Sequence, residues 1–262
     1  MPMPIPRATT AGSPGRIPCD AGKATKALEP RLVVAPVSHA SQLRIIALFE
    51  DLPPADLARV AALCVIRKYE KHAQIMSEHD QTTDVFFVLA GSVRVSSYTE
   101  AGREVIFTDM AEGDMCGEFS ALDHLPRSAT AVALTDCTLA RMPAARFYEL
   151  LQRHNDIAIR MLELLVAKIR KMSERVFEVS ALAVRARVKR ELLRLATEGT
   201  QFANGVVIRP APTHYEIAAR IGSHREAVTR EFNRLEAGKV IEVRRRQIRI
   251  VDLERLKAAE EE

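Results

Sequence analysis

A glutamate and an arginine nine positions apart carry the clearest chemical signal in this 262-residue sequence. They are Glu118 and Arg127, and the residues between them are mostly small or apolar. An arginine in such surroundings needs an anionic partner, and its planar guanidinium suits a bidentate grip on a phosphate group. A carboxylate accepts hydrogen bonds from ribose hydroxyl groups. The pair therefore predicts a nucleotide-binding site, whereas no spacing of nucleophile and base or of paired carboxylates indicates an enzyme.

Residues 213–235 hold a second signal, the spacing of a helix-turn-helix. Ala218 is small enough to let two helices approach, Gly222 accepts the left-handed backbone of the turn, and Val228 packs the second helix inward. Ser223 is well placed to cap that second helix. The spacing therefore predicts a pair of helices whose second member enters the major groove of DNA.

The first turn of the second helix presents groups that can read base pairs. Arg225 and Glu226 lie in this turn, and Arg230 follows Glu226 by four residues on the same face. Arginine binds guanine O6 and N7 and glutamate accepts from cytosine N4, so the three residues can read G·C pairs. The alternative is an i,i+4 salt bridge between Glu226 and Arg230 on a solvated helix. Further DNA contacts are expected from Ser223, His224 and Thr229.

Three consecutive arginines, Arg244, Arg245 and Arg246, separate two short strand patterns at residues 240–243 and 247–251. This arrangement indicates a wing hairpin. Its arginines are expected to contact phosphates, which gives an affinity that depends on salt but carries no sequence information.

The nucleotide signal lies within a run of short strands between residues 65 and 142. Many short strands separated by turns predict a closed antiparallel barrel or roll, which one short helix interrupts at residues 117–130. A helical pattern follows from about residue 144. Within it, residues repeat at spacings of three and four, which is the seam of a coiled coil and favours a homodimer. The alternative is a seam that packs on its own roll. The seam residues are Ile159, Leu162, Val166, Ile169, Ser173 and Val176.

Charge is distributed unevenly along the chain. Residues 41–140 hold 8 Lys or Arg against 15 Asp or Glu, a net charge of −7, whereas residues 181–262 hold 17 against 12, a net charge of +5. An acidic front and a basic back indicate that the C-terminal part approaches a polyanion. Residues 1–40 contain seven of the thirteen prolines and no periodic apolar pattern, so a disordered extension is expected there.

Neither a signal peptide nor an apolar run long enough to span a membrane is visible, so we expect a cytoplasmic protein. The four cysteines, Cys19, Cys64, Cys116 and Cys137, are scattered without a C-x-x-C pair. This spacing argues for separate reduced thiols and against a disulfide framework or a zinc site. The histidines show no ligand spacing either, so no metal is expected.

Residues 117–130 resemble the phosphate-binding cassette of cyclic-nucleotide-binding domains: Gly-Glu, a short apolar helix, then Pro-Arg-Ser-Ala-Thr. With the order of roll, long helix and winged helix-turn-helix, residues 41–255 resemble the cAMP receptor protein / fumarate-nitrate reductase regulator (CRP/FNR) family. The resemblance implies an α+β fold with an antiparallel β-roll of the double-stranded β-helix type, a long dimerisation helix and a winged helix-turn-helix. The implied domains are 41–143, 144–180 and 181–262, after the extension of residues 1–40.

The resemblance also assigns roles to residues of the cassette and the long helix. It implies that Glu118 binds the ribose and Arg127 the phosphate of cAMP or cGMP. Family members that respond to cAMP carry Thr-Ser on the long helix to meet the adenine, and this chain has Met172-Ser173. Methionine is only a weak acceptor, so the choice between the two nucleotides stays open. The implied ligand-binding residues are Gly117, Glu118, Phe119, Ser120, Arg127, Ser128, Met172 and Ser173.

The motif Arg225-Glu226-x-Val228-x-Arg230 matches the base-reading triplet of the cAMP receptor protein branch. The match implies a palindromic operator with half-sites like TGTGA, bound by a homodimer that works with RNA polymerase. The oxygen-sensing branch needs an N-terminal cysteine cluster. Because Cys19 stands alone, the resemblance does not extend to an iron–sulfur sensor.

Two other interpretations within the same family stay open. In the first, Asp123 or Asp114 neutralises Arg127 internally, and DNA binding needs no ligand. In the second, the protein is a redox sensor that acts through Cys116, which adjoins the cassette. That role requires an exposed thiol with a lowered pKa.

Overall fold

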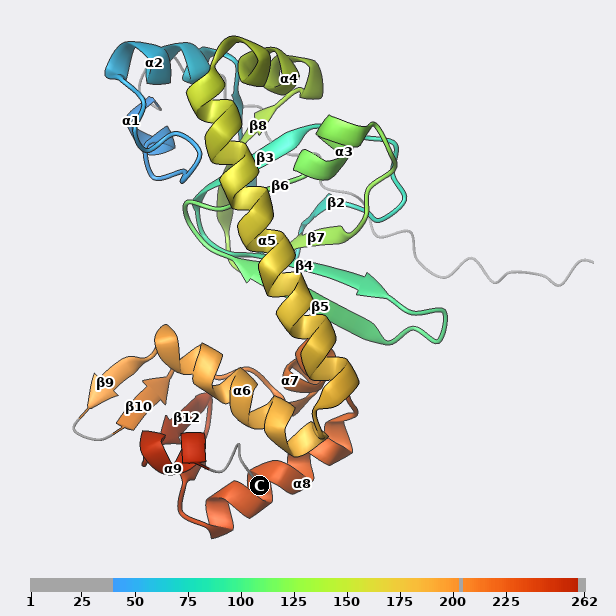
Figure 1. Cartoon of the computed structure of the whole chain (residues 1–262), viewed down its shortest axis with the longest axis vertical. Coiled ribbons are helices and arrows are strands. Elements are labelled where there is room, and N and C mark those ends of the chain that lie inside the picture. Colours follow the sequence, from blue (N-terminus) through green and yellow to red (C-terminus); the bar gives the residue numbers. More distant parts are fainter. Residues whose placement is uncertain (1–39, 203–204, 259–262) are drawn as a thin grey trace, which may run out of the picture.

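The computed structural model describes residues 40–202 and 205–258. A β-rich N-terminal domain and a smaller C-terminal domain are joined by one long helix (Figure 1), which confirms the predicted α+β arrangement. The extension predicted for residues 1–40 and the isolated Cys19 lie outside the described residues, apart from Ala40 at the start of helix α1 (Ala40–Leu43).

The N-terminal domain contains two antiparallel four-stranded sheets, with strand orders β1-β8-β3-β6 and β2-β7-β4-β5. The apolar run at residues 85–89 is buried along its whole length because its strand is an interior member of the first sheet. Gly91, with φ +87°, turns the chain into the second sheet; a Cβ there would lie 2.5 Å from the Asp136 carbonyl oxygen. The strands are β1 (Val65–Tyr69), β2 (Gln74–Met76), β3 (Val85–Ala90), β4 (Val93–Tyr98), β5 (Glu104–Met110), β6 (Met115–Cys116), β7 (Thr130–Ala133) and β8 (Cys137–Met142).

Helix α3 (Glu118–Asp123) interrupts the strands between β6 and β7, as the sequence predicted. Two further helices, α2 (Pro54–Ala62) and α4 (Ala144–Arg153), contribute apolar side chains to the same core as β3. At the centre of this core the ring of Phe87 lies 5.0 Å from that of Phe49 and 6.4 Å from that of Phe147, centroid to centroid. These aromatic contacts fix the roll against the helices that flank it.

The long helix is α5 (Asn155–Ala181), and it runs past the roll toward the C-terminal domain (Figure 1). The helical region predicted from residue 144 is interrupted at His154, whose extended backbone (φ −126°, ψ 93°) ends α4. Ile157 and Met161 of α5 are buried in the core of the roll. Within the described part of the chain, no helix is both long and apolar enough to cross a membrane.

The predicted seam of α5 does not pack on its own roll. Its apolar residues Ile159, Leu162, Val166, Ile169 and Val176 are between 49% and 65% exposed in the single chain. A row of exposed apolar side chains along one helix is unusual for a surface that faces water only. The alternative that this seam covers its own domain is therefore wrong.

The C-terminal domain packs α6 (Val184–Thr197) and the helix pair α7 (His214–Ile221) and α8 (Arg225–Ala237) against a four-stranded sheet of order β11-β12-β10-β9. Val188, Leu192 and Phe232 are among its fully buried side chains. The hairpin of β11 and β12 is the predicted wing. The remaining elements are β9 (Thr200–Phe202), β10 (Gly205–Ile208), β11 (Ile241–Arg244), β12 (Gln247–Ile250) and α9 (Leu253–Ala258).

We expect Phe87→Ala to lower the free energy of unfolding by about 3–5 kcal/mol, because it empties the centre of the aromatic cluster. Urea denaturation followed by circular dichroism measures this change. Phe107→Ala on β5 is the matched control: that ring is 52% exposed, so its loss should change stability by only about 0.5 kcal/mol. Equal losses for the two variants would contradict the core described here.

Candidate functional site

Arg127 is the most buried charged side chain of the cassette, with only 2% of its surface exposed. Its guanidinium donates hydrogen bonds from Nε to the Thr82 hydroxyl at 3.0 Å, from Nη1 to the Gly117 carbonyl at 3.0 Å and from Nη2 to the Asp84 carbonyl at 2.7 Å. Guanidinium carries five N–H donors, so one donor on each terminal nitrogen is left over from these bonds. Two such donors suit the bidentate binding of a phosphate.

No carboxylate within the described part of the chain forms an ion pair with Arg127. The carboxylate of Asp84 forms an ion pair with Arg141 at 2.7 Å instead. Asp123 accepts from the Leu125 amide, and Asp114 binds the Ala111 amide, both at 2.9 Å.

Internal neutralisation of Arg127 by Asp123 or Asp114 is therefore wrong, since both carboxylates serve local turns. Burial lowers the pKa of the Arg127 guanidinium, because a charged group away from water is disfavoured. A site that holds a buried cation by neutral oxygens alone is suited to an anionic ligand.

Gly117 is required by the way Arg127 is held. Its φ is +86°, in the left-handed region that side chains rarely adopt. A Cβ at this position would lie 2.5 Å from the Asp84 carbonyl oxygen and 2.7 Å from Nη1 of Arg127. The residue can therefore offer its own carbonyl to Arg127 only as glycine.

Glu118 follows directly and is also buried, with 3% exposure. Its Oε1 lies 2.5 Å from Nζ of Lys168, which comes from the middle of α5. The same ammonium group lies 5.9 Å from the ring centroid of Phe119 and 3.5 Å from the Met115 carbonyl oxygen. The long helix is thus tied to the predicted ribose-binding carboxylate through one lysine.

Lys168 was not among the residues predicted for this site. A signal was available, since Lys168 precedes Met172 by four residues and so lies on the same helix face. Met172 itself is 59% exposed, and the exposed Ser173 donates its hydroxyl to the Ile169 carbonyl at 3.0 Å.

The structure therefore brings together Gly117, Glu118, Phe119 and Arg127 around the cassette. Ser120 is buried in α3, and Ser128 is exposed at the cassette's far end. Met172 and Ser173 form no hydrogen bond with the cassette in the described chain. The described residues also contain no group of three or more His, Cys, Asp or Glu side chains able to hold a metal ion.

The helix-turn-helix forms as the spacing predicted, with Gly222 in the left-handed conformation between α7 and α8. Ser223 does not cap α8, however. The N-cap residue is His224, and its side chain forms no capping hydrogen bond. Ser223 is buried, and its amide donates to the Ala218 carbonyl at 2.9 Å. The serine thus completes the end of α7, because the turn is one residue longer than the sequence suggested.

The start of α8 presents His224, Arg225, Glu226 and Arg230 to solvent. No ion pair joins Glu226 to Arg230 among the described residues, so the predicted i,i+4 salt bridge does not form. Thr229 is turned inward instead: its hydroxyl donates to the Arg225 carbonyl and contacts Nδ1 of His214, each at 2.9 Å. The exposed polar groups suit the base edges of the major groove.

The wing places three arginines at the tip of the hairpin. Arg244 ends β11, and Arg245 and Arg246 form the exposed turn to β12. Arg246 takes a left-handed conformation with φ +58°. Arg244 lies 3.6 Å from the carboxylate of Glu242, in an exposed pair that contributes little to stability. The hairpin tip is free to meet phosphates.

Comparisons with known proteins agree with both sites. Residues 66–154 match the family model described as "Cyclic nucleotide-binding domain", and residues 186–259 match "Crp-like helix-turn-helix domain". The cAMP-activated global transcriptional regulator CRP of Salmonella typhimurium is 28% identical over 174 residues, which cover 66% of this chain and 83% of CRP. The cAMP-activated global transcriptional regulator Vfr of Pseudomonas aeruginosa is 28% identical over 192 residues, covering 72% and 90%.

Solved structures show the same fold. The c-di-GMP responsive global regulator CLP of Xanthomonas campestris superposes with a TM-score of 0.67 at 21% identity, covering 76% of this chain and 99% of CLP. FixK2 of Bradyrhizobium japonicum superposes with a TM-score of 0.65 at 18% identity, covering 74% and 96%. These likenesses concern the arrangement of the two domains and the long helix between them.

The redox interpretation fails on the environment of Cys116. This thiol is buried, and burial raises its pKa to about 12, so the reactive thiolate is scarce at neutral pH.

We expect Cys116 to escape alkylation by iodoacetamide at pH 8 in the native protein and to react once urea unfolds the chain. Ser128→Cys, an exposed position of the same cassette, provides a thiol that should react in the native state. Peptide mass spectrometry distinguishes the two sites, and native labelling of both at one rate would reinstate a redox role.

Proposed function

Because the chain belongs to the CRP/FNR family of transcription regulators, we propose that it is a homodimer whose affinity for a palindromic operator is controlled by a cyclic nucleotide. The observation that carries this proposal is the buried guanidinium of Arg127, which has neutral oxygen partners and two donors to spare. A cyclic phosphate supplies one negative charge and two free oxygens. Arg127 would bind that phosphate, and Glu118 would accept a hydrogen bond from the ribose.

Both cAMP and cGMP suit this cassette, since Arg127 and Glu118 contact parts that the two nucleotides share. The curated relatives CRP and Vfr are named as cAMP-activated, which favours cAMP. Met172, where cAMP-responsive relatives carry threonine, removes a hydrogen-bonding group from the base. We therefore propose a cyclic purine nucleotide, with cAMP ahead of cGMP.

Dimerisation is proposed from the exposed seam of α5. Ile159, Leu162 and Val166 line a groove on the helix surface, and the apolar row continues to Val176. A second copy of the same helix would cover this row in a parallel coiled coil. Met172 and Ser173 lie on the same stretch of helix, so a partner helix would bring them close to the ligand sites.

Arg225, Glu226 and Arg230 are exposed at the start of α8, where a dimer would present them to two successive major grooves. Half-sites like TGTGA offer guanines to the arginines and a cytosine to the glutamate. The wing arginines would bind the phosphate backbone alongside. A regulator of this kind acts with RNA polymerase in the cytoplasm.

Isothermal titration calorimetry tests the nucleotide site. We expect the parent protein to bind cAMP or cGMP and Arg127→Gln to bind it at least about tenfold more weakly, because the charge-assisted hydrogen bonds to the phosphate are lost. Arg127→Lys, which keeps the charge but not the planar fork, should fall between them. Arg146→Gln on α4, which breaks an exposed ion pair with Glu149, should bind as the parent does. Thermal melts establish that each variant is folded.

Two results would refute the nucleotide site. One is the absence of heat from either nucleotide at millimolar concentration with the folded parent protein. The other is an unchanged affinity in folded Arg127→Gln.

Fluorescence anisotropy with a labelled TGTGA palindrome tests the DNA-reading face. We expect Arg225→Ala to weaken operator binding by about 1–3 kcal/mol and to reduce discrimination against a changed guanine. Arg234→Ala is the matched control on the same helix, because that side chain pairs with Glu231 at 3.2 Å and lies in the last turn of α8, away from Arg225. If both variants lost the same affinity, or if Arg225→Ala kept full discrimination, another surface would have to read the bases.

A further inference from the structure

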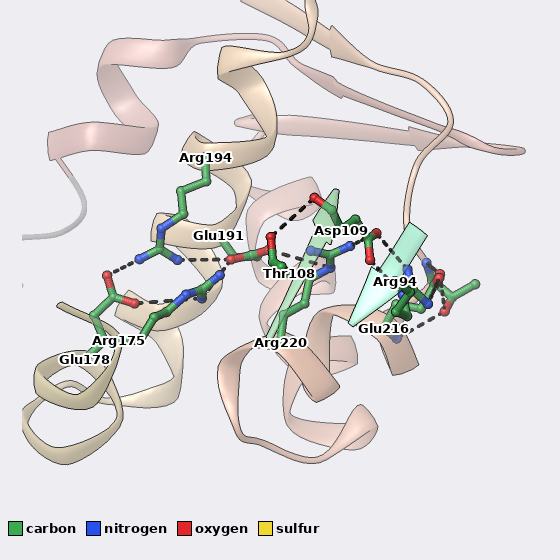
Figure 2. Close-up of polar contacts among 10 residues, drawn as sticks. Arg94, Thr108, Asp109, Arg175, Glu178, Glu191, Arg194, Glu216 and Arg220 are labelled. Carbon is green, nitrogen blue, oxygen red and sulfur yellow. Dashed lines mark hydrogen bonds and ion pairs between the residues drawn. The ribbon is translucent and has the colours of Figure 1, made fainter. Parts of the chain in front are cut away.

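Four charged side chains join the roll directly to the helix-turn-helix (Figure 2). Arg94 of β4 and Asp109 of β5 face each other across paired strands, with Nε–Oδ1 at 2.8 Å and Nη2–Oδ2 at 2.9 Å. Nη1 of Arg94 also reaches Oε1 of Glu216 on α7 at 2.8 Å, and Asp109 accepts a further hydrogen bond from Arg220 on α7. These four residues are called the α7 latch below.

The latch is partly shielded from water, unlike most surface ion pairs. The side chains of Arg94 and Arg220 are 13% and 11% exposed. Burial acts to raise the pKa of Asp109, but hydrogen bonding from Arg94 and the charge of Arg220 hold this pKa below its usual value. The carboxylate of Asp109 is therefore charged at neutral pH. Removing one member leaves its partner charged and partly buried, which is costly.

Glu216 has two functions in this arrangement. Its Oε2 accepts from the amide and hydroxyl of Thr213, at 2.8 Å and 3.0 Å, and so forms the capping box of α7. Its Oε1 is free to bind Arg94. Since Arg220 binds Asp109 one helical turn later, the roll holds α7 at two points. The helix can neither rotate nor slide against the roll without breaking an ion pair.

The held helix determines where the reading face lies. Ile217 and Ala218 of α7 share one buried cluster with Val228 of α8. Because this core is tightly packed, α7 and α8 move together. A displacement of α7 against the roll would therefore displace Arg225 and the rest of the recognition helix.

The latch also lies close in the fold to the cassette. Strand β7 begins at Thr130, three residues after Arg127, and pairs with β4 so that Ser96 faces Thr130 and Arg94 faces Val132. A shift of Arg127 toward a ligand would thus be transmitted through β7 to β4, the strand that carries Arg94. This route is separate from the one through Lys168 and α5.

A third element meets the latch from the other side. Nε of Arg220 lies 3.8 Å from Glu191 of α6, which pairs with Arg175 of α5 at 3.0 Å (Figure 2). Arg220 is therefore placed between the roll, on one side, and the junction of α5 and α6, on the other. Any rearrangement at that junction changes the balance between the contacts of Arg220 with Asp109 and with Glu191.

We propose that the α7 latch positions the recognition helix relative to the roll and carries part of the coupling between nucleotide and operator, an inference that rests on the function proposed above. Arg94 and Asp109 are then positioning residues, which act on DNA through α7 without touching it. Coupling between two sites is a ratio of affinities, so it is measurable without knowing which arrangement binds DNA more tightly.

Operator affinity with and without saturating nucleotide gives this ratio, using whichever of cAMP and cGMP the parent protein binds. We expect Asp109→Asn to bring this ratio of operator affinities closer to one by at least about fivefold, since coupling between two sites typically changes an affinity by roughly 5- to 150-fold. An asparagine turns an N–H donor toward one of the two arginines. Glu216→Gln should have the same effect while preserving the fold, because glutamine also serves in a capping box. Asp56→Asn, which breaks the ion pair with Arg59 inside α2, should keep the parent ratio.

Amide hydrogen exchange of α7 supplies a second readout, which needs neither nucleotide nor DNA. We expect faster exchange in α7 of Asp109→Asn, with no change in the core strands of the roll. If saturating nucleotide left the operator affinity of the parent protein unchanged, which is a ratio of one, the proposed function would be refuted. The latch would then have no coupling to transmit. A parent ratio that differs from one and that both latch variants retain would overturn the latch alone. Unchanged exchange in α7 would equally overturn its positioning role.

Discussion

The buried charge of Arg127, which has no ion-pair partner among the described residues, is the constraint on which the rest of the nucleotide site depends. Removing a guanidinium from water is costly unless oxygen acceptors or an anion replace the solvent. Three neutral oxygens hold this side chain, and one of them requires a left-handed glycine at Gly117. The site is thereby formed before any ligand arrives, which reduces the entropy that binding must overcome. It also leaves the charge for an anion to neutralise.

Two structural routes lead from this site to the DNA-reading face, and they differ in chemistry. The first is α5, which Lys168 ties to Glu118 and which carries the exposed apolar seam of the proposed dimer. The second is the ion pairing of Arg94 and Asp109 with α7. The first combines the ion pair of Lys168 and Glu118 with the apolar packing of the proposed dimer, whereas the second consists of ion pairs within one chain.

Local sequence patterns predicted most of the fold and half of the site. The buried run of β3, the glycine of the helix-turn-helix and the Glu118–Arg127 pair are all visible within short windows. Lys168 and Glu118 are 50 residues apart and Arg94 and Glu216 are 122 apart, so no window shows these pairs. Their partners follow from tertiary packing alone. The predicted cap at Ser223 failed for a smaller reason, since α8 starts after His224 and propensity does not fix a helix boundary to one residue.

In the proposed function, the negative charge of a phosphate completes the Arg127 site. Thermal unfolding of the parent protein with cAMP and with adenosine, at equal concentrations, tests it most directly, because adenosine keeps the base and ribose but lacks the phosphate. A ligand present at 100 times its dissociation constant stabilises the folded state by about 2.7 kcal/mol. We expect a clear rise of the melting temperature with cAMP and none with adenosine. An equal rise with both ligands, or no rise with either, would contradict it.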